Sequence, residues 1–227
     1  MTIDETVISS YSTGDPDCLL SDSKVRKLLS DNPSARFLEY ERGENVFKEG
    51  KPIVGFYLIC EGVVKEFSCP SVGNRITLKV FHAGDVLITD DFFFDEGRYQ
   101  TRAEALTEVE ALFIERSVFP ELMRVAGGKM GIKLAQNMRY LRKNLEFSSF
   151  PVLKKIAYWL AKLLPDSSNR FTVSNKELAE IVGCSHVTVS KKLSRLADDD
   201  LIEKEGMEIT VLDKARLKEK ATSTSFG

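Results

Sequence analysis

The 227-residue sequence predicts an α+β protein with an N-terminal antiparallel β-domain, a long helix and a C-terminal winged helix-turn-helix. Three observations support this prediction. Short runs rich in Val, Ile, Phe and Tyr between glycines fill residues 37–115, which is typical of an antiparallel sandwich or barrel. A helical pattern of apolar residues follows over residues 117–147. A capped helix, a glycine turn and a second helix then occupy residues 174–196.

The composition indicates a globular protein with a hydrophobic share of 43% and a net charge of −2. From residue 150 onward, 13 Lys and Arg stand against 11 Asp and Glu, whereas the preceding part is acidic. This asymmetry suits a small basic binding surface on an acidic body. No apolar run approaches the roughly 20 residues that span a bilayer, and residues 1–22 lack a signal-peptide pattern. We therefore expect a cytoplasmic protein with no membrane partner.

The cysteines and histidines give little support to a metal enzyme. Four cysteines lie without CxxC spacing, so we expect reduced packing or surface residues rather than disulfides, zinc or an iron–sulfur cluster. A cupin-like metal enzyme with a helical appendage is the alternative class, and it needs clustered His and carboxylate ligands. The two histidines, His82 and His186, fall in different predicted domains. We therefore assign no catalytic residue and no metal ligand.

The first 116 residues contain the predicted β-domain and a lead-in segment. We expect a flexible arm over about the first 20 residues, followed by a short helix near residues 23–32. Strands are predicted over residues 54–67 and 75–81, with a turn at 71–74 between them. Residues 90–97 do not alternate as a strand should, and they predict a short helix or loop at a sheet edge.

The long helix carries an apolar stripe that needs a partner. Its pattern is interrupted at Gly127 and Gly128 and then resumes. The stripe consists of Ile132, Leu134, Met138, Leu141 and Leu145. It could pack on its own β-domain or form a coiled-coil seam in a dimer, and we favour the seam because the helix is too long for one small sheet to cover.

The C-terminal segment carries the strongest local signals. Pro151 precedes a predicted helix over residues 152–164. Ser174 and Glu177 match a capping box, Gly183 suits a left-handed helix end, and Ser185 suits the cap of the next helix. An acidic turn at residues 198–200 and two short strands up to residue 212 complete a wing.

The second helix of this motif has a face suited to DNA. Val189, Leu193 and Leu196 form its inner face, and its outer face presents His186, Val187, Ser190 and Lys191. Short or cationic groups at the N-terminal end of such a helix meet base edges in the major groove. We favour DNA binding over an ordinary helical hairpin in a small α+β domain, and over a module that only binds proteins.

The motif Ser-Asn-Lys-Glu-Leu-Ala-Glu-Ile-Val-Gly-Cys-Ser-His-Val-Thr-Val-Ser-Lys-Lys-Leu at residues 174–193 carries a family resemblance. The β-domain adds glycines at 43, 50, 62 and 73 and the pair Gly84–Asp85. Over residues 33–213 the chain resembles the cyclic-AMP receptor protein and FNR family of bacterial regulators. This resemblance implies a cyclic-nucleotide-binding-like β-roll (jelly roll), a dimerisation helix, and a homodimer on a palindromic promoter site with RNA polymerase as a partner.

The resemblance also implies a domain order and a set of DNA contacts. The domains are an arm and short helix (1–32), a β-roll sensor (33–116), a dimerisation helix (117–147) and the DNA-binding domain (148–227). Phosphate contacts fall on Ser174, Asn175, Lys176 and Thr188, base contacts on His186, Val187 and Lys191, and Ser185, Ser190 and Lys192 complete the predicted interface. Where the cyclic-AMP receptor has a glutamate, Val187 offers only apolar contact, which predicts an A·T-richer half-site.

The effector is the open question at this level. Family members that bind cyclic AMP carry a glutamate for the ribose hydroxyl and an arginine for the phosphate. Cyclic AMP is not expected here, because Asp85 is shorter than that glutamate and Arg98 or Arg102 could replace that arginine only with a shift in register. Cys18 stands alone, which argues against an iron–sulfur sensor, and haem has only His82 in the β-domain to bind it. The candidate effector residues are Asp85, Arg98, Tyr99, Thr101, Arg102 and Tyr140. A small organic or redox signal held between residues 92–94, Tyr99 and the long helix near Tyr140 is one alternative. A pocket filled by its own aromatic side chains is the other.

Overall fold

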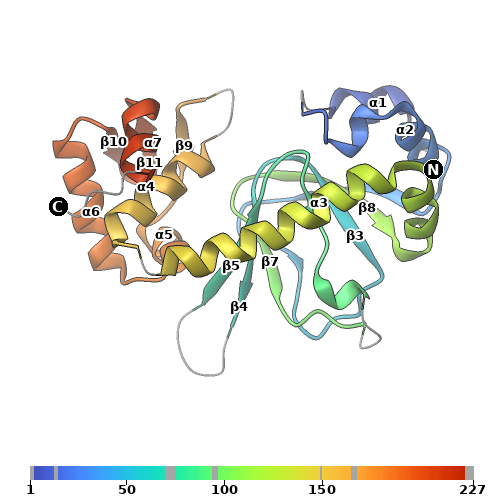
Figure 1. Ribbon diagram of the computed structural model, residues 1–227, viewed down its shortest axis with the longest axis horizontal. Coiled ribbons are helices and arrows are strands. Elements are labelled where there is room, and N and C mark those ends of the chain that lie inside the picture. The colour runs from blue at the N-terminus through green and yellow to red at the C-terminus, as the bar shows by residue number, and fades with distance from the viewer. Residues whose placement is uncertain are drawn as a thin grey trace. The chain divides into compact units, whose positions relative to one another are not determined.

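The computed structural model describes residues 3–12, 15–69, 75–93, 97–148, 150–164 and 168–222, with the backbone alone described for 140–148 and 222. The chain forms two compact units (Figure 1). The first comprises Met1–Cys69 and Leu78–Arg142, and the second comprises Pro70–Thr77 and Lys143–Gly227. The four-part division predicted from the sequence is finer than these two units and stays a prediction.

Two four-stranded sheets form the β-domain of the first unit. One has the order β1 (Ala35–Tyr40), β8 (Val109–Glu115), β3 (Gly55–Glu61) and β6 (Val86–Leu87), with all neighbours antiparallel. The other has the order β2 (Asn45–Phe47), β7 (Arg102–Ala105), β4 (Val64–Ser68) and β5 (Ile76–Phe81). This arrangement confirms the predicted β-roll and the strand expected over residues 75–81. The strand expected over residues 54–67 is divided into β3 and β4 by a turn at Gly62.

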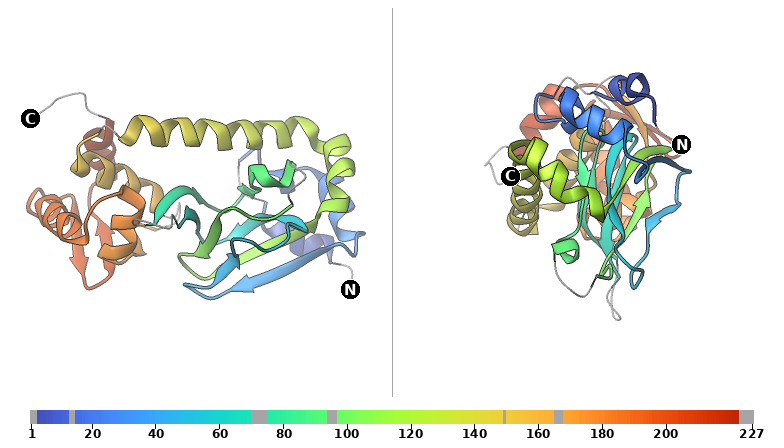
Figure 2. Two further views of the ribbon diagram at one scale, coloured as in Figure 1. Left: turned by 90° about the horizontal axis from the view of Figure 1, so that it is seen from below. Right: turned by 90° about the vertical axis from the view of Figure 1, so that its right-hand side faces the viewer.

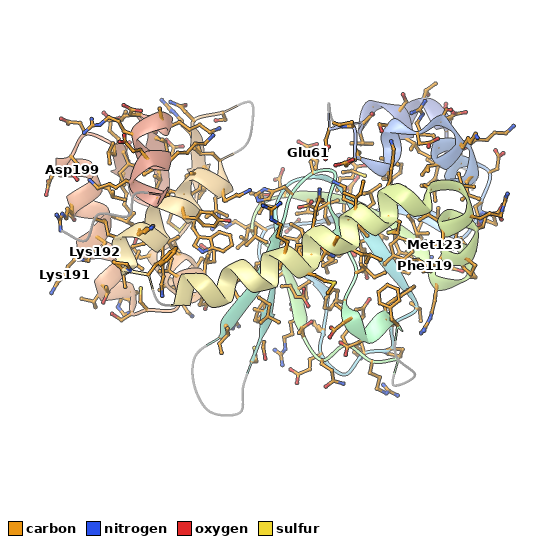
Figure 3. The ribbon with its side chains drawn as sticks, in the orientation of Figure 1. Glu61, Phe119, Met123, Lys191, Lys192 and Asp199 are labelled. Atoms are coloured by element: carbon orange, nitrogen blue, oxygen red, sulfur yellow. The ribbon has the colours of Figure 1, made fainter. Side chains whose placement is uncertain are left out.

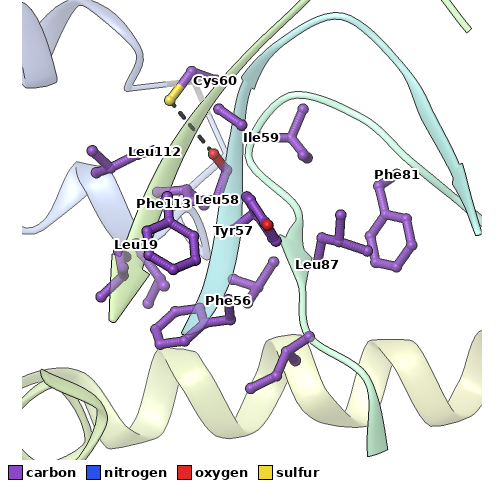
Figure 4. Packing of buried hydrophobic residues seen from close by; sticks show 14 of the residues in the cluster. Leu19, Phe56, Tyr57, Leu58, Ile59, Cys60, Phe81, Leu87, Leu112 and Phe113 are labelled. Carbon is purple, nitrogen blue, oxygen red and sulfur yellow. Dashed lines mark hydrogen bonds between the residues drawn. The ribbon is translucent and has the colours of Figure 1, made fainter. Parts of the chain in front are cut away.

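The core lies between these sheets, and β3 is central to it. Six of the seven residues of β3 are buried. In the sheet register, Leu58 pairs with Leu112 on one face of the sheet and Tyr57 pairs with Phe113 on the other. Figure 4 shows these residues, with the Cys60 thiol 3.7 Å from the Leu58 carbonyl oxygen. Each fully buried side chain of this size stabilises the fold by roughly 1.5–3 kcal/mol. Cys60 therefore serves as a packing residue, as the sequence predicts.

The N-terminal segment packs on this core, so the prediction of a flexible arm is wrong for its described part. Helix α1 (Glu5–Ser10), the short 3-10 helix η1 (Leu19–Ser21) and α2 (Ser23–Ser30) all contribute buried side chains. Ile8 and Leu19 are 0% exposed. The overall polarity of the segment hid these apolar residues, which are too widely spaced to form a periodic pattern. Asp22 caps α2 by accepting a hydrogen bond from the Lys24 backbone N–H at 2.9 Å.

Gly62, in the turn between β3 and β4, has a backbone that only glycine fits. Its φ is +85°, and a Cβ there would lie 2.1 Å from the Glu108 carbonyl oxygen. The left-handed conformation alone costs other residues about 1–2 kcal/mol. We expect Gly62→Ala to lower the free energy of unfolding by about 2 kcal/mol or more, measured by urea denaturation. Gly206→Ala, also at positive φ but with no atom within 4 Å of the added Cβ, should cost less; equal losses would contradict the clash.

The segment after β6 confirms the predicted irregularity. Residues Asp90–Phe93 form a 3-10 helix, η2. The Phe92 ring is buried, and it meets the Phe56 and Phe119 rings at centroid distances of 5.7 and 5.1 Å. Phe94 and the predicted turn at 71–74 lie outside the described residues.

A single long helix, α3, spans Phe119–Ser148 after the 3-10 helix η3 (Arg116–Val118). It bends at Ala126, whose φ of −134° and ψ of 28° are not helical, directly before Gly127 and Gly128 (Figure 2). The predicted interruption at these glycines is therefore confirmed as a kink. Two glycines in succession remove the side chains that would otherwise stiffen the turn.

The apolar stripe of α3 divides between two faces. Leu122, Ala126 and Met130 are buried against the β-domain, and Leu134 packs on the same core. Ile132 and Met138 are 42% and 73% exposed. The alternative of packing on the β-domain is thus confirmed for Leu134. Ile132 and Met138 stay uncovered in the chain, and the coiled-coil seam stays a prediction. Tyr140, Leu141 and Leu145 lie outside the described side chains.

The second unit is a winged helix-turn-helix with an added C-terminal helix. Its elements are α4 (Val152–Leu163), β9 (Arg170–Thr172), α5 (Asn175–Val182), α6 (His186–Asp198), β10 (Ile202–Glu205), β11 (Glu208–Val211) and α7 (Lys214–Thr222). The wing sheet has the order β10-β11-β9. The sequence analysis missed α7, which packs on α4 and buries Leu217 and Ala221. The sequence signal for α7 is Asp213, a residue type that favours the N-cap of a helix. Its carboxylate accepts a hydrogen bond from the Arg216 backbone N–H at 2.9 Å.

Candidate nucleic-acid interface

The first helix of the motif, α5, begins and ends as its sequence predicts. The Ser174 hydroxyl accepts from the Glu177 N–H at 3.1 Å, and the Glu177 carboxylate accepts from the Ser174 N–H at 2.7 Å. Gly183 ends the helix with φ +73° and ψ 45°. The reciprocal cap and the left-handed glycine together fix where the next helix begins.

The second helix, α6, is capped by Ser185. Its hydroxyl accepts from the Thr188 N–H at 3.1 Å and lies 2.9 Å from the Thr188 hydroxyl. These two side chains therefore order the first turn of α6. The free N–H groups of that turn and the positive end of the helix dipole suit contact with a phosphate group.

The outer face of α6 is open to solvent where base contacts are predicted. His186, Ser190 and Lys191 are exposed, and Val187 is 51% exposed. Figure 3 shows Lys191 and Lys192 on this helix. Lys192 is half-buried and lies at the flank. The inner face, formed by Val189, Leu193 and Leu196, is buried as predicted.

Two further candidates lie in the first turn of α5. Lys176 is exposed, whereas Ser174 and Asn175 are half-buried. Among the described residues, the Asn175 amide oxygen is one of the few buried polar atoms without a hydrogen-bond partner. An exposed lysine beside a helix N-terminus is suited to a phosphate rather than to a base edge.

The wing carries little positive charge. Glu203, Glu205 and Glu208 are exposed around the hairpin, and Glu208 pairs with Arg170 at 3.6 Å. Lys204 donates to the Gly206 carbonyl oxygen within the turn. Because acidic side chains repel phosphates, the cationic contacts to a nucleic acid are expected from α5 and α6.

The candidate effector residues do not converge on one point. The Asp85 carboxylate accepts from the His82 N–H at 2.9 Å and so closes the turn from His82 to Asp85, which contains Gly84 with a φ of +85°. Arg98 is exposed and donates to the Gly50 carbonyl oxygen at 2.8 Å. Arg102 lies 3.6 Å from the Glu49 carboxylate. These contacts hold each side chain in a structural role.

The two remaining described candidates face the interior. Tyr99 is 5% exposed and stacks on Phe47 with ring centroids 3.9 Å apart. This stacking matches the sequence alternative in which aromatic side chains fill the interior. The Thr101 hydroxyl donates to the Glu66 carboxylate at 2.8 Å.

Sequence reasoning missed the polar residues inside the β-domain. Burial raises the pKa of Glu66 to about 7 and lowers the pKa of Lys79 to about 8. The Lys79 ammonium donates to the amide oxygen of Asn137 on α3. Lys79 shares one face of β5 with the buried Phe81, and a lysine in such an alternating pattern was the available signal.

No group of three or more His, Cys, Asp or Glu side chains within the described part of the chain is arranged to hold a metal ion. None of its helices combines the length and the apolar character that a bilayer-spanning segment requires.

Comparison with known proteins identifies both units. The family model described as "Cyclic nucleotide-binding domain" matches residues 37–125, and the "Crp-like helix-turn-helix domain" matches residues 154–220. The chain belongs to the Crp/Fnr family of bacterial transcription regulators. Regulators of the Crp/Fnr family bind DNA as dimers, and so the described face of α6 is the surface to test.

Individual relatives cover most of the chain. The "Cyclic AMP receptor protein" of Thermus thermophilus is 28% identical over 185 residues, which is 79% of this chain and 85% of the relative. The "Fumarate and nitrate reduction regulatory protein" of Vibrio cholerae is 25% identical over 198 residues, 80% of this chain and 76% of the relative. A Crp-family regulator from Thermus thermophilus has a similar fold, with a TM-score of 0.70 at 25% identity over 82% of this chain and 97% of that one.

These matches decide between the function classes left open by the sequence. The Crp/Fnr relatives are transcription regulators and not enzymes, so the cupin-like enzyme is not favoured. They differ in the signals that their names record, since one is a cyclic AMP receptor and another regulates fumarate and nitrate reduction. A cyclic-nucleotide-binding domain is present. Because the relatives differ in their signals, their names do not identify the ligand of this chain.

Proposed function

We propose that this Crp/Fnr protein is a cytoplasmic homodimer that binds a palindromic promoter site through α6 and acts on RNA polymerase. The observation that carries the proposal is the exposed face of α6, where His186, Ser190 and Lys191 are free of the core that holds Val189 and Leu193. In a dimer, two such helices about 34 Å apart enter successive major grooves. A small-molecule or redox signal in the β-domain then changes the affinity by favouring one arrangement of the helices.

The residues of the interface divide by role. His186, Val187, Ser190 and Lys191 read base edges, whereas Ser174, Asn175, Lys176, Ser185, Thr188 and Lys192 contact the backbone of the DNA. Val187 can offer only a methyl contact, which suits the C5-methyl group of thymine. In vitro selection of DNA fragments by the purified protein tests this proposal: we expect an inverted repeat with half-sites one helical turn apart. Enrichment of no sequence would contradict it.

Lys176 provides a test of the backbone contacts. We expect Lys176→Ala to weaken binding equally on specific and random DNA, because a lysine at a helix N-terminus meets phosphate. Losing one phosphate contact in each protomer should reduce the slope of log K against log salt by about 1 per half-site. Fluorescence anisotropy across a salt series measures this slope. Lys162→Ala, an exposed lysine in the last turn of α4, is the matched control and should leave the slope unchanged.

A further inference from the structure

The polar face of α5 carries more negative than positive charge, although its first turn is the candidate phosphate contact. Four apolar residues form the buried side of the helix, and the remaining side chains are Asn175, Lys176, Glu177 and Glu180. One cation thus lies beside two carboxylates. Because negative side chains repel the phosphates of DNA, this balance of charge opposes the contact expected at Lys176.

The first carboxylate, Glu177, has a role within the helix. It accepts a hydrogen bond from the Ser174 backbone N–H at 2.7 Å as one half of the capping box. A negative charge in the first turn also offsets the positive end of the helix dipole. The position of Glu177 is therefore explained by the start of α5 alone.

The second carboxylate, Glu180, has no comparable role in its own helix. It lies in the last turn of α5, which ends at Val182, and there a negative charge adds to the negative end of the dipole. Its side chain is only 13% exposed, so the carboxylate is largely removed from water. Such burial costs free energy unless a cation is near. We therefore look outside α5 for the charge that offsets Glu180.

Glu180 is also a neighbour of the candidate phosphate contact. It follows Lys176 by four residues, and residues with this spacing lie on one face of a helix, about 6 Å apart along its axis. At physiological salt a charge acts over about 8 Å. The charge of Glu180 therefore reaches a phosphate group that is held by Lys176.

Arg75 supplies a cation to Glu180 from a distant part of the sequence. One terminal nitrogen of its guanidinium lies 4.0 Å from a carboxylate oxygen of Glu180. This distance is too long for a hydrogen bond, so the attraction is between the two charges. Arg75 directly precedes β5, and its segment, Pro70–Thr77, belongs to the same compact unit as the helix-turn-helix.

We propose that Arg75 is a positioning residue of the DNA interface, which acts by offsetting the charge of Glu180 beside the phosphate that Lys176 contacts. Counted with Arg75, the polar face of α5 has two cations and two carboxylates and no net charge. Arg75 lies within residues 37–125, so the residues matched by the helix-turn-helix model do not contain the whole interface. This inference rests on the proposed function, because it requires α5 to meet DNA.

The experiment measures DNA affinity of the full chain by fluorescence anisotropy on the selected palindrome and on random DNA. We expect Arg75→Gln to weaken binding about three- to tenfold on both, because the dimer loses one ion pair in each protomer and phosphate contacts carry no sequence information. Glu180→Gln should keep or raise the affinity. The double variant should bind within about twofold of the unsubstituted protein, because the charge that Arg75 offsets is then absent.

Two further measurements separate this role from general effects. Arg124→Gln removes an arginine from another exposed ion pair, with Glu121 of α3 at 2.8 Å, and should leave DNA affinity unchanged. A salt series distinguishes repulsion from a damaged fold, because screening shortens the reach of a charge from about 10 Å at 0.1 M to about 3 Å at 1 M. The loss in Arg75→Gln should therefore shrink as salt rises, whereas a folding defect would persist.

The inference is wrong if Arg75→Gln binds both DNAs as tightly as the unsubstituted protein, or if Glu180→Gln does not restore the loss. The second result would mean that Arg75 contacts phosphate itself or only supports the fold. Random DNA keeps the test decisive if no palindrome is selected, a result that overturns the proposed sequence-specific function alone. A selected palindrome without any effect of Arg75 would overturn this inference alone, and a chain that binds no DNA would overturn both.

Discussion

Met138→Asp is expected to separate the dimer into monomers and to abolish specific DNA binding. Met138 is 73% exposed on α3, and Gly128, Gly131, Ile132 and Ala135 are exposed on the same side of the helix. We expect a second copy of the chain to cover this face, because Crp/Fnr homologues bind DNA as dimers. In a twofold seam the same residues meet across the axis, so one substitution places two carboxylates in the interface.

The expected loss of DNA affinity is large because a dimer holds two half-sites at once, whereas a monomer holds only one. Linking two binding modules raises affinity by roughly 100- to 10,000-fold over one module, and a monomer loses that gain. Analytical ultracentrifugation measures the dimer, and fluorescence anisotropy on a selected palindrome measures DNA affinity. Val54→Asp, which places the same charge on another exposed apolar residue of the first unit, should leave both unchanged. A Met138→Asp protein that stays dimeric would exclude this face as the seam.

The helix-turn-helix could be predicted from the sequence because its signals are local. The cap at Ser174 and Glu177 and the glycine at 183 lie within ten residues of one another, and each allows few backbone conformations. The wing could be predicted for the same reason, because its turns and short strands are also marked by neighbouring residues. Helix α7 was missed because its buried residues, Leu217 and Ala221, are a single pair one turn apart.

The interior of the β-domain could not be predicted in the same way. Lys79 and Asn137 meet although they are separated by 58 residues, and nothing near either one in the sequence indicates the other. Periodicity placed Leu134 and Met138 on one stripe of α3, but only the position of the sheet shows that Leu134 is covered by the core and Met138 is not. Long-range packing thus decides which side chains meet inside the β-domain and which side chains of α3 stay exposed.

Lys191→Ala is expected to reduce both the affinity for the selected site and the preference for it over random DNA. Lys191 is exposed on α6 one turn beyond Val187, so both side chains project from the same face of the helix. A lysine at such a position donates to guanine O6 or N7 in the major groove. Since α6 carries no exposed arginine in its first two turns, Lys191 is its main cationic contact to a base edge.

The loss should be about 1–3 kcal/mol for each half-site, and hence at least about thirtyfold for the dimer. Competition between the selected palindrome and random DNA separates specificity from affinity. Lys191→Ala should narrow the ratio between the two, whereas Lys176→Ala should lower both affinities and keep the ratio. This contrast tests the orientation of α6 directly, because a lysine that only neutralised phosphate would behave as Lys176 does. An unchanged ratio in Lys191→Ala would mean that another face of the unit reads the DNA.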